Sequence, residues 1–458
     1  MIRLMTSEIA MALQATLIGD DTAIHSVSTD SRQINAGDLF IALQGPNFDG
    51  HRFVDEVIGQ GAIALIVNRQ LPVSVPQIVV EDTRIALGQL GALVKAKVAP
   101  KTVAVTGSAG KTTVKEMLAA ILSRIGQVLA TAGNFNNDIG VPLTLLRLEA
   151  QHKFAVIELG ANHLGEIAYT SSLVKPDVAM ITNVAAAHIE GFGDLFGVAR
   201  AKGEIYSGLS DGALAIVPMD SEFHSYWLQR LSHLNIQGFS LTQATDFTAE
   251  QVVLDSQGCA GFELVSPYGR KFIQLVIPGK HNVANALAAA AAALAMGASL
   301  QDVQLGLASM KPVKGRINVY QAKPTVRVID DTYNANVESV KAAIDLLAAY
   351  AGTRILVLGD MGELGPDARM YHEEVGAYAK QSGINLLFTL GVLSQNASEL
   401  FHQNGAHFSS RVQLVTRLLP YLSSSEDVSI LVKGSRSAKM ELVVQDLLES
   451  CQQEKDPC

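Results

Sequence analysis

The stretch VAVTGSAGKTT, residues 103 to 113, contains a modified form of a phosphate-binding loop. In the usual form, four residues separate a first glycine from Gly-Lys-Ser/Thr, after a buried strand and before a helix. Here Val105 occupies the place of that glycine, and the first glycine is Gly107. Small residues still let backbone N–H groups approach phosphate oxygens, and the N-terminus of a helix favours negative charge. The stretch therefore predicts a strand, a phosphate-binding loop and a helix.

The residue types in this loop predict that it binds a nucleotide. Lys111 can reach the β- and γ-phosphates, and the hydroxyl of Thr112 can bind Mg²⁺. A plain glycine turn is the alternative, but the Gly-Lys-Thr-Thr run favours the nucleotide. A kinase, a GTPase, a motor and a ligase are all compatible with the loop, although no Asn-Lys-x-Asp guanine signature occurs in the chain. The predicted nucleotide-binding residues are Gly107, Ser108, Ala109, Gly110, Lys111, Thr112 and Thr113.

Strand-like and helix-like segments alternate on both sides of the loop. The apolar runs KTVAVT, QVLAT, KFAVIEL and DVAMIT predict a parallel sheet covered by helices on both faces. Residues 250–278 are typical of antiparallel strands, and the alanine-rich segment 286–298 predicts a buried helix. The alternation resumes near residue 313 with VRVID, RILVLGD, NLLFTL and VSILVKGS. Before residue 84, the runs DLFIAL, AIALIV and QIVV are separated by turns that contain glycine.

These patterns predict an α/β protein of three domains. A chain of 458 residues is too long for one hydrophobic core. We expect a small N-terminal α/β domain over residues 1–83 and a central P-loop ATPase domain with a parallel sheet over residues 84–312. A C-terminal Rossmann-like α/β domain is expected over residues 313–458.

The composition excludes several classes of protein. The formal charge of −9, without a long run of either sign, disfavours a general nucleic-acid binder. Cys259, Cys451 and Cys458 lack metal-ligand spacing and a disulfide framework, which fits a reducing cytoplasm. Glu8 and Gln14 interrupt the apolar run that a signal peptide needs. No apolar stretch reaches the ~20 residues that span a bilayer. We therefore expect a cytoplasmic protein that is not inserted in a membrane.

Two polar residues follow strands of the predicted central sheet. Glu158 ends a buried strand at the edge where ligands of open α/β sheets bind, and a carboxylate there suits Mg²⁺. A glutamate with a structural partner is an equally good interpretation. His188 lies in the loop after the next strand, where a single histidine is also typical of polar surface.

Seven motifs together resemble one family. They are TGSAGKTT, ELGANHLGEI, NVAAAHIEGFG, PGKHNVANALAAAA, DDTYNANVES, LGDMGELG and KGSRSAKM, and they cover nearly the whole chain in order. In this combination the chain resembles the Mur ligases of peptidoglycan synthesis, whose phosphate loop has the spacing TGxxGK[ST]T. The stretches TAGNFNNDIGVP, DDTYNAN and KGSRS resemble the branch of the family that uses D-alanyl-D-alanine.

The resemblance implies an ATP-dependent amide ligase. ATP would phosphorylate the terminal carboxylate of a UDP-N-acetylmuramoyl-tripeptide, and the amine of D-alanyl-D-alanine would attack the acyl phosphate. Two Mg²⁺ ions can stabilise both sides of such a transfer. The resemblance further implies a cytoplasmic monomer whose first domain binds the UDP-substrate. Diaminopimelate and lysine both remain open as the third residue of the tripeptide.

The resemblance also implies catalytic residues and metal ligands. The expected catalytic residues are Lys111, His188 and Lys202. Thr112 and Glu158 would bind the Mg²⁺ of the nucleotide, and His188 and Lys202 would bind the second ion. Lys202 lies where several members carry a carbamylated lysine, whose oxygens attract a cation that an ammonium would repel. A helix-surface lysine paired with Glu204 or solvent is the alternative.

Further residues are expected at the nucleotide and at the substrates. The expected nucleotide contacts are Asn282, Arg316, Asp331, Tyr333 and Asn336. The expected contacts of the incoming dipeptide are Asn334, Lys433, Ser435 and Arg436. The expected contacts of the UDP-tripeptide are Ser31, Arg32, Phe48, Asp49, His51, Asn134, Asn136 and Asn137. Each of these residues taken alone is also compatible with an ordinary polar strand end, and only the joint pattern favours a site.

Two alternatives from other classes remain at this point. A folylpolyglutamate synthetase shares the architecture and the chemistry, but neither this first domain nor DDTYNAN is expected in one. A nucleotide-binding switch without catalysis needs no second metal, so the combination of Glu158, His188 and Lys202 argues against it.

Overall fold

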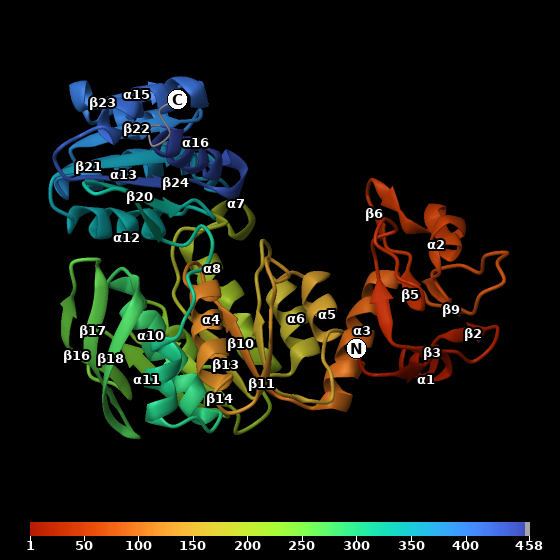
Figure 1. Cartoon of the computed structure of the whole chain (residues 1–458). Coiled ribbons are helices and arrows are strands. Elements are labelled where there is room, and N and C mark those ends of the chain that lie inside the picture. The colour runs from red at the N-terminus through yellow and green to blue at the C-terminus, as the bar shows by residue number, and fades with distance from the viewer. Residues whose placement is uncertain (454–458) are drawn as a thin grey trace.

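The computed structural model of the protein describes residues 1–453, and Cys458 lies outside this range. Figure 1 shows three regions, each with its own sheet: the N-terminal region lies to one side of the central region, and the C-terminal region lies above it. The predicted class, an α/β protein of three domains, is confirmed. Within the described part of the chain, no helix is both long and apolar enough to cross a bilayer.

The N-terminal region contains a five-stranded sheet in the order β2-β9-β8-β5-β4. Its strands are β2 (Thr16–Ile18), β4 (Ser26–Ser28), β5 (Asp38–Ile41), β8 (Ala64–Val67) and β9 (Gln77–Val79). The predicted apolar runs form β5, β8 and β9. The other elements are β1 (Leu4–Met5), α1 (Thr6–Ala12), β3 (Ala23–Ile24), β6 (Gln44–Gly45), β7 (Phe48–Asp49), η1 (Gly50–Phe53) and α2 (Val54–Gln60).

The central region is built on a nine-stranded sheet in the order β11-β12-β10-β13-β14-β15-β16-β17-β18. All neighbours from β11 to β16 are parallel, and β16, β17 and β18 are antiparallel, as predicted. The strands are β10 (Lys101–Thr106), β11 (Gln127–Ala130), β12 (His152–Glu158), β13 (Val178–Ile181), β14 (Leu214–Pro218), β15 (Asn235–Ser240), β16 (Phe247–Leu254), β17 (Cys259–Ser266) and β18 (Gly269–Pro278). The loops after β10, β12 and β13 share one edge of the sheet, because these three strands are parallel neighbours.

Helices cover both faces of this sheet because successive residues of its strands point to opposite sides. Val103 and Val105 of β10 pack into a core with α4 and α10, whereas Ala104 packs into the opposite core. The alanine-rich helix α10 is buried, as predicted, and lies against α4. The helices of the region are α3 (Thr83–Val98), α4 (Lys111–Leu122), α5 (Gly140–Leu145), α6 (Glu166–Val174), α7 (Ile189–Phe192), α8 (Leu195–Gly203), η2 (Glu204–Gly208), α9 (His224–Leu228), α10 (His281–Ala295) and α11 (Leu300–Ala308).

The C-terminal region contains a six-stranded sheet in the order β19-β20-β24-β21-β22-β23, parallel except for β19. The four predicted runs form β20 (Val326–Asp331), β21 (Thr353–Gly359), β22 (Leu386–Leu390) and β24 (Val428–Lys433). The other elements are β19 (Asn318–Lys323), α12 (Val337–Ala348), η3 (Gly365–Asp367), α13 (Ala368–Gln381), α14 (Gln395–Glu399), η4 (His402–Asn404), β23 (Gly405–Phe408), α15 (Arg411–Leu422), η5 (Arg436–Ala438) and α16 (Glu441–Gln453).

Helix α3 joins the N-terminal region to the central one. Its buried residues Leu87, Leu90 and Val94 belong to a core that includes side chains from both regions. The predicted boundaries lie between the sheets, one at the start of α3 and the other between α11 and β19. We propose residues 1–83, 84–312 and 313–458 as the three domains.

Candidate active site

The phosphate loop runs from the buried strand β10 into helix α4. Gly107 (φ +151°) and Gly110 (φ +80°) have backbone conformations that L side chains rarely adopt. A Cβ atom on Gly110 would lie 2.5 Å from the Asn285 side-chain oxygen, so the close approach of α10 also requires glycine. The loop is further held by Ala109, whose N–H donates to Asn183 Oδ1 at 2.8 Å. The strand, loop and helix predicted from the sequence therefore form as expected.

Lys111 lies folded over this loop. Its ammonium group donates to the Gly107 carbonyl at 2.6 Å. Burial lowers the pKa of Lys111, the Glu158 carboxylate raises it, and the charge of Arg316 lowers it. The ammonium therefore contacts the loop that would surround a phosphate, and a phosphate oxygen could replace the carbonyl as its partner.

Glu158 and Thr112, the two expected ligands of the first metal, are in direct contact. The Thr112 hydroxyl donates to Glu158 Oε2 at 2.9 Å, and Asn136 Nδ2 donates to Glu158 Oε1 at 2.8 Å. Glu158 is 3% exposed. A buried carboxylate beside a hydroxyl is a donor set for a hard cation such as Mg²⁺, so these residues fit the ion. No group of three His, Cys, Asp or Glu side chains in residues 1–453 could complete a metal site, so further oxygen ligands would have to come from elsewhere.

Lys202 is buried in α8. It is 1% exposed, and its Nζ lies 5.2 Å from the centre of the Phe192 ring. The surface alternative considered for Lys202 is therefore wrong, and Glu204 instead accepts from the N–H groups of Gly165 and Ala168. Burial lowers the pKa of Lys202 to about 7, and the nearby charge of Lys111 adds to this effect. A large share of this amine is neutral near pH 7, which is the form that can react with CO₂.

His188 lies beside the phosphate loop and reaches the C-terminal region. It precedes α7, and a small cavity of about 60 Å³ lies between its side chain, the loop and the C-terminal residues Asn334, Asn336 and Glu363. Its Nδ1 is in contact with the carboxylate of Glu363. The structure thus brings His188 to the expected place, with a partner from another domain.

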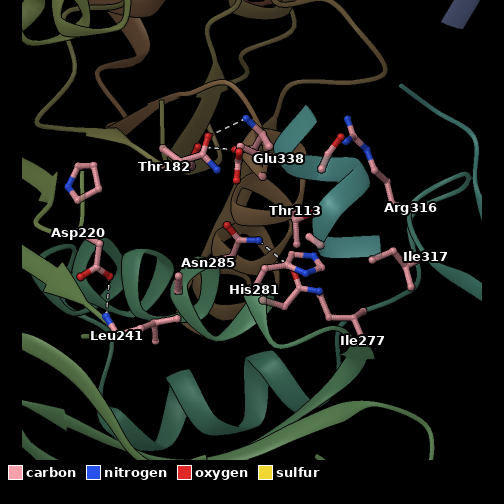
Figure 2. A pocket seen from close by; sticks show the side chains of 18 of the residues that line it. Thr113, Thr182, Asp220, Leu241, Ile277, His281, Asn285, Arg316, Ile317 and Glu338 are labelled. Atoms are coloured by element: carbon pink, nitrogen blue, oxygen red, sulfur yellow. Dashed lines mark hydrogen bonds between the residues drawn. The ribbon is translucent and has the colours of Figure 1, made fainter. Parts of the chain in front are cut away.

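A larger cavity of about 380 Å³ opens between the central and C-terminal regions. Figure 2 shows Thr113, His281, Asn285, Arg316 and Glu338 around it. Burial, with a smaller effect from the charge of Lys433, lowers the pKa of His281 to about 4, so its ring is neutral at pH 7. Other lining residues are Ala109, Gly110, Asp220, Phe239, Leu241, Ile277, Asn282, Ile317, Asp331, Ala342 and Lys433.

Arg316 connects this cavity to the phosphate loop. Its Nη2 lies 3.4 Å from the Thr112 hydroxyl, and its guanidinium lies 4.2 Å from the centre of the Tyr333 ring. Asn336 also crosses the boundary, since its Nδ2 donates to the Ser108 carbonyl at 3.2 Å while its Oδ1 caps α12. Three of the expected C-terminal residues are therefore assembled around the loop.

The residues of the last motif, KGSRS, lie in different surroundings. Lys433 lines the large cavity, where it forms an ion pair with Asp331 at 2.5 Å and donates to the Asn334 carbonyl at 3.0 Å. Ser435 accepts a hydrogen bond of 2.6 Å from the Gly362 N–H. Arg436 has a side chain that is 70% exposed and pairs with Glu441 at 3.2 Å. Each of these three residues thus has a partner within the protein in this arrangement.

Comparisons with known proteins identify the family. The Mur ligase middle domain matches residues 105–293, the Mur ligase glutamate ligase domain matches residues 315–436, and the Mur ligase family catalytic domain matches residues 23–124. The chain belongs to the Mur ligase family. The resemblance seen in its motifs is thereby confirmed.

Relatives of this Mur ligase match along its whole length. The chain is 47% identical over 451 residues to the UDP-N-acetylmuramoyl-tripeptide–D-alanyl-D-alanine ligase of Escherichia coli (strain K12), covering 98% of this chain and 99% of the relative. Identity to the ligase of the same name from Bacillus subtilis (strain 168) is 35%, with the same coverage. A crystal structure of MurF from Acinetobacter baumannii superposes with a TM-score of 0.94 at 40% identity, covering 98% and 99% of the two chains. MurF from Thermotoga maritima in complex with ADP has a TM-score of 0.84 at 27% identity, covering 94% and 98%.

The N-terminal residues expected at the UDP-substrate form a separate group in this Mur ligase. Asp49 contacts Nδ1 of His51 at 2.6 Å, and Nε2 of His51 accepts from the Asn68 N–H at 3.1 Å. Both ring nitrogens of the buried His51 therefore have partners within the N-terminal region. Arg32 has a side chain that is 83% exposed and pairs with Asp30 at 2.8 Å.

Other expected contacts of the UDP-tripeptide lie on turns. Phe48 is 47% exposed and stacks on Phe53, with ring centres 5.7 Å apart. Ser31 is buried at the start of its turn. Asn134 is exposed in the loop after β11, and Asn137 Oδ1 accepts from the Gly140 N–H at 2.8 Å.

The sequence analysis assigned no role to Lys115 or Glu363, which both contact residues of the site of this Mur ligase or their supports. Lys115, 1% exposed in α4, donates to the Thr131 carbonyl at 2.6 Å. The Thr131 hydroxyl in turn accepts from the N–H of Glu158 at 2.9 Å. The signal was a charged residue on the apolar face of the helix that follows the loop. Glu363 was quoted within LGDMGELG, but no role was assigned to it.

Proposed function

We propose that this Mur ligase joins D-alanyl-D-alanine to UDP-N-acetylmuramoyl-tripeptide in the synthesis of peptidoglycan precursors. Each turnover converts ATP to ADP and phosphate. The observation that carries the proposal is the Thr112–Glu158 pair beside the phosphate loop at one sheet edge, together with buried Lys202, whose amine is close enough to be affected by the charge of Lys111. Full-length relatives of the chain are named UDP-N-acetylmuramoyl-tripeptide–D-alanyl-D-alanine ligase. We further propose that it acts as a monomer in the cytoplasm.

In the first step, a terminal carboxylate oxygen of the tripeptide attacks the γ-phosphorus of ATP, and ADP leaves. Lys111 would neutralise charge on the β- and γ-phosphates from the loop side, and Arg316 from the C-terminal side. Charge stabilisation and alignment supply most of the catalysis in such transfers, because the protein forms no covalent bond to the phosphoryl group. The product is an acyl phosphate.

In the second step, the amine of D-alanyl-D-alanine attacks the acyl carbon. The tetrahedral intermediate loses phosphate and the amine loses a proton, which leaves an amide. We assign the dipeptide to the side of the loop formed by the C-terminal region, near Asn334, Lys433, Ser435 and Arg436. Lys433 and Arg436 would have to exchange their present carboxylate partners for the dipeptide.

Thr112 and Glu158 would hold the Mg²⁺ of the nucleotide, and His188 with carbamylated Lys202 would hold a second ion. When bound, Mg²⁺ neutralises the charge that develops on the transferring phosphoryl group. The buried amine of Lys202 supports this proposal, since its carbamate would supply anionic oxygen where an ammonium would repel the cation.

We propose that ATP occupies the large cavity, with adenine near Asn282 and ribose near Asp331. The remaining proposed nucleotide contacts are Gly107, Ser108, Ala109, Gly110, Thr113, Tyr333 and Asn336. The proposed contacts of the UDP-tripeptide are Ser31, Arg32, Phe48, Asp49, His51, Asn134, Asn136 and Asn137, of which Asn136 also contacts Glu158.

The test is phosphate release from ATP, measured with UDP-N-acetylmuramoyl-tripeptide in the presence and absence of D-alanyl-D-alanine. We expect rapid release only when both substrates are present, and an amide product by mass spectrometry. Equal release without the dipeptide, or turnover with a folate and glutamate instead, would contradict the proposal. Nucleotide binding without any turnover would indicate the non-catalytic switch.

A further inference from the structure

The motif LGDMGELG, residues 358 to 365, has no part in the proposed mechanism, yet it contacts the central region. The carboxylate of Glu363 is in contact with Nδ1 of His188. The Glu363 carbonyl lies 3.4 Å from the N–H of Glu190, and Gly365 approaches the backbone of Glu190. The loop after β21 therefore contacts the segment that contains His188 through both side chain and backbone.

Both residues of this contact have a constrained backbone. The φ angle is +55° at His188 and +62° at Glu363, in the left-handed region that residues other than glycine rarely occupy. Such conformations persist only where the surrounding structure imposes them, and they are frequent at functional sites. Two of them face each other here, across a domain boundary.

Buried His372 of α13 holds one side of the loop. Its Nε2 accepts from the Met361 N–H at 3.0 Å, and its Nδ1 lies 2.7 Å from the Ala368 carbonyl. These contacts require a neutral ring that donates from Nδ1. They fix the backbone two residues before Glu363.

Ser435 holds the other side of the loop. Its hydroxyl accepts from the Gly362 N–H at 2.6 Å, and its own N–H donates to the Asp360 carbonyl at 2.9 Å. The loop is therefore fixed immediately before Glu363 by a residue that follows β24. This arrangement leaves Glu363 little freedom to move away from its partner.

The ring of His188 stands between this loop and the phosphate loop. The cavity of about 60 Å³ beside it is lined by Ser108 and Lys111 on one side and by Glu363 on the other. Nδ1 is enclosed and is in contact with the Glu363 carboxylate. Because this contact occupies Nδ1, Nε2 is the ring nitrogen left for a ligand.

We propose that Glu363 is a positioning residue that orients the His188 ring toward the phosphate loop when the C-terminal domain is docked. The inference rests on the proposed function, in which His188 binds the second Mg²⁺. Carboxylates that contact the second nitrogen of a metal-binding histidine fix the ring, and their loss lowers metal affinity or activity ~10–100-fold. Because the pair joins two domains, His188 has this partner only when the two domains are docked.

The test combines Glu363→Gln, which keeps the size of the side chain and removes its charge, with His188→Ala. Binding of Mn²⁺ in the presence of a non-hydrolysable ATP analogue is measured from the paramagnetic resonance signal of free Mn²⁺. We expect Glu363→Gln to weaken the second Mn²⁺ and the rate of phosphate release about 10-fold, with the first Mn²⁺ unchanged. The double variant should be no slower than His188→Ala. Glu373→Gln, whose partner is Arg369 on the exposed side of α13, is the matched control and should resemble the unmodified enzyme.

Two outcomes would overturn the inference. One is a second Mn²⁺ bound by Glu363→Gln as tightly as by the unmodified enzyme. The other is a double variant in which the two effects multiply, because independent residues act additively in free energy. If the unmodified enzyme itself releases no phosphate with its substrates or binds a single Mn²⁺, the proposed function or its second metal site is wrong, and this inference falls with it.

Discussion

The hydroxyl of Thr112 donates a 2.9 Å hydrogen bond to Glu158, although 46 positions separate the two residues. The register of the sheet brings them together, because Val105 of β10 pairs with Glu158 of the parallel neighbour β12. The pairing of β10 with β12 therefore fixes the position of the Glu158 carboxylate relative to the phosphate loop. A cation between nucleotide and carboxylate would require the Thr112 hydroxyl to turn its hydrogen away and offer an oxygen lone pair.

Replacing Glu158 by Gln should separate metal binding from nucleotide binding. Glutamine keeps the size and can still contact Thr112, but it removes the negative charge that attracts Mg²⁺. We expect the Mg²⁺ concentration for half-maximal rate to rise at least ~10-fold, while ADP measured by calorimetry without Mg²⁺ binds as before. The exposed Glu149→Gln, just before the same strand, is the control. An unchanged dependence of the rate on Mg²⁺ concentration would show that Glu158 has a structural role and does not bind the ion.

Replacing Lys111 by Ala should abolish turnover without changing the fold. The ammonium donates to the loop carbonyl of Gly107, and Lys111 is not part of the hydrophobic cores on either face of the central sheet, so its loss opens no apolar core. Loss of one preorganised charge at a transferring phosphoryl group lowers the rate by ~100-fold or more. Phosphate release measures the rate, and circular dichroism measures the fold. Lys101→Ala, at the exposed start of β10, should keep its activity. A Lys111→Ala variant with most of its rate would contradict the assignment.

The fold could be predicted where the hydrophobic pattern was strong. Buried parallel strands such as β10 and β12 are nearly continuous apolar runs, and α10 consists mostly of alanine. The edge strands β19 and β23 were missed, because NVYQAK and GAHF are half-exposed and carry no such run. Edge strands are stabilised by a neighbouring strand that the local sequence does not reveal.

The local geometry of the candidate site was predicted where a motif is local, as in the strand, loop and helix around Lys111 and at the strand end of Glu158. The partners of Lys433, Ser435 and Arg436 could not be predicted, because they depend on how β20, β21 and α16 pack around one loop. For the same reason, Glu363 was not recognised. Its partner His188 lies 175 positions away in another domain, and only the docking of the two domains brings them together.

Replacing Lys115 by Met should disturb Glu158 indirectly. Methionine fills a similar volume but leaves the buried Thr131 carbonyl without its donor, which costs about 1–3 kcal/mol of unfolding free energy. Because Thr131 also accepts from the Glu158 N–H, we expect a severalfold rise in the KM for Mg·ATP with a smaller change in kcat. Lys101→Met is the control for a lost surface charge. A destabilised variant with unchanged KM would limit Lys115 to a structural role.

His281 should make stability depend on pH between about 6.5 and 4. Burial lowers its pKa to about 4, so in this range the unfolded chain binds a proton that the folded chain does not. Acidification therefore favours unfolding through this residue, by about 1–3 kcal/mol over the range. Urea unfolding at pH 7 and 4.5 should show a smaller loss for His281→Gln than for the unmodified protein. Exposed His233→Gln should behave like the unmodified protein, and equal losses in all three would contradict the assignment.

Lys202 should form a carbamate in the folded enzyme. With a pKa of about 7, its amine is substantially neutral at pH 8, so its nitrogen can attack CO₂ and lose a proton. Incubation with ¹³C-bicarbonate should give a carbamate signal by NMR that disappears on acidification and in Lys202→Ala, but not in Lys101→Ala. Lys202→Ala should lose most activity, and acetate should partly restore it by supplying the missing oxygens. Lys202→Arg should stay inactive, because a guanidinium keeps a charge of the wrong sign beside a cation. An active Lys202→Arg variant, or an enzyme without the carbamate signal whose rate ignores bicarbonate, would show that Lys202 acts as an unmodified amine.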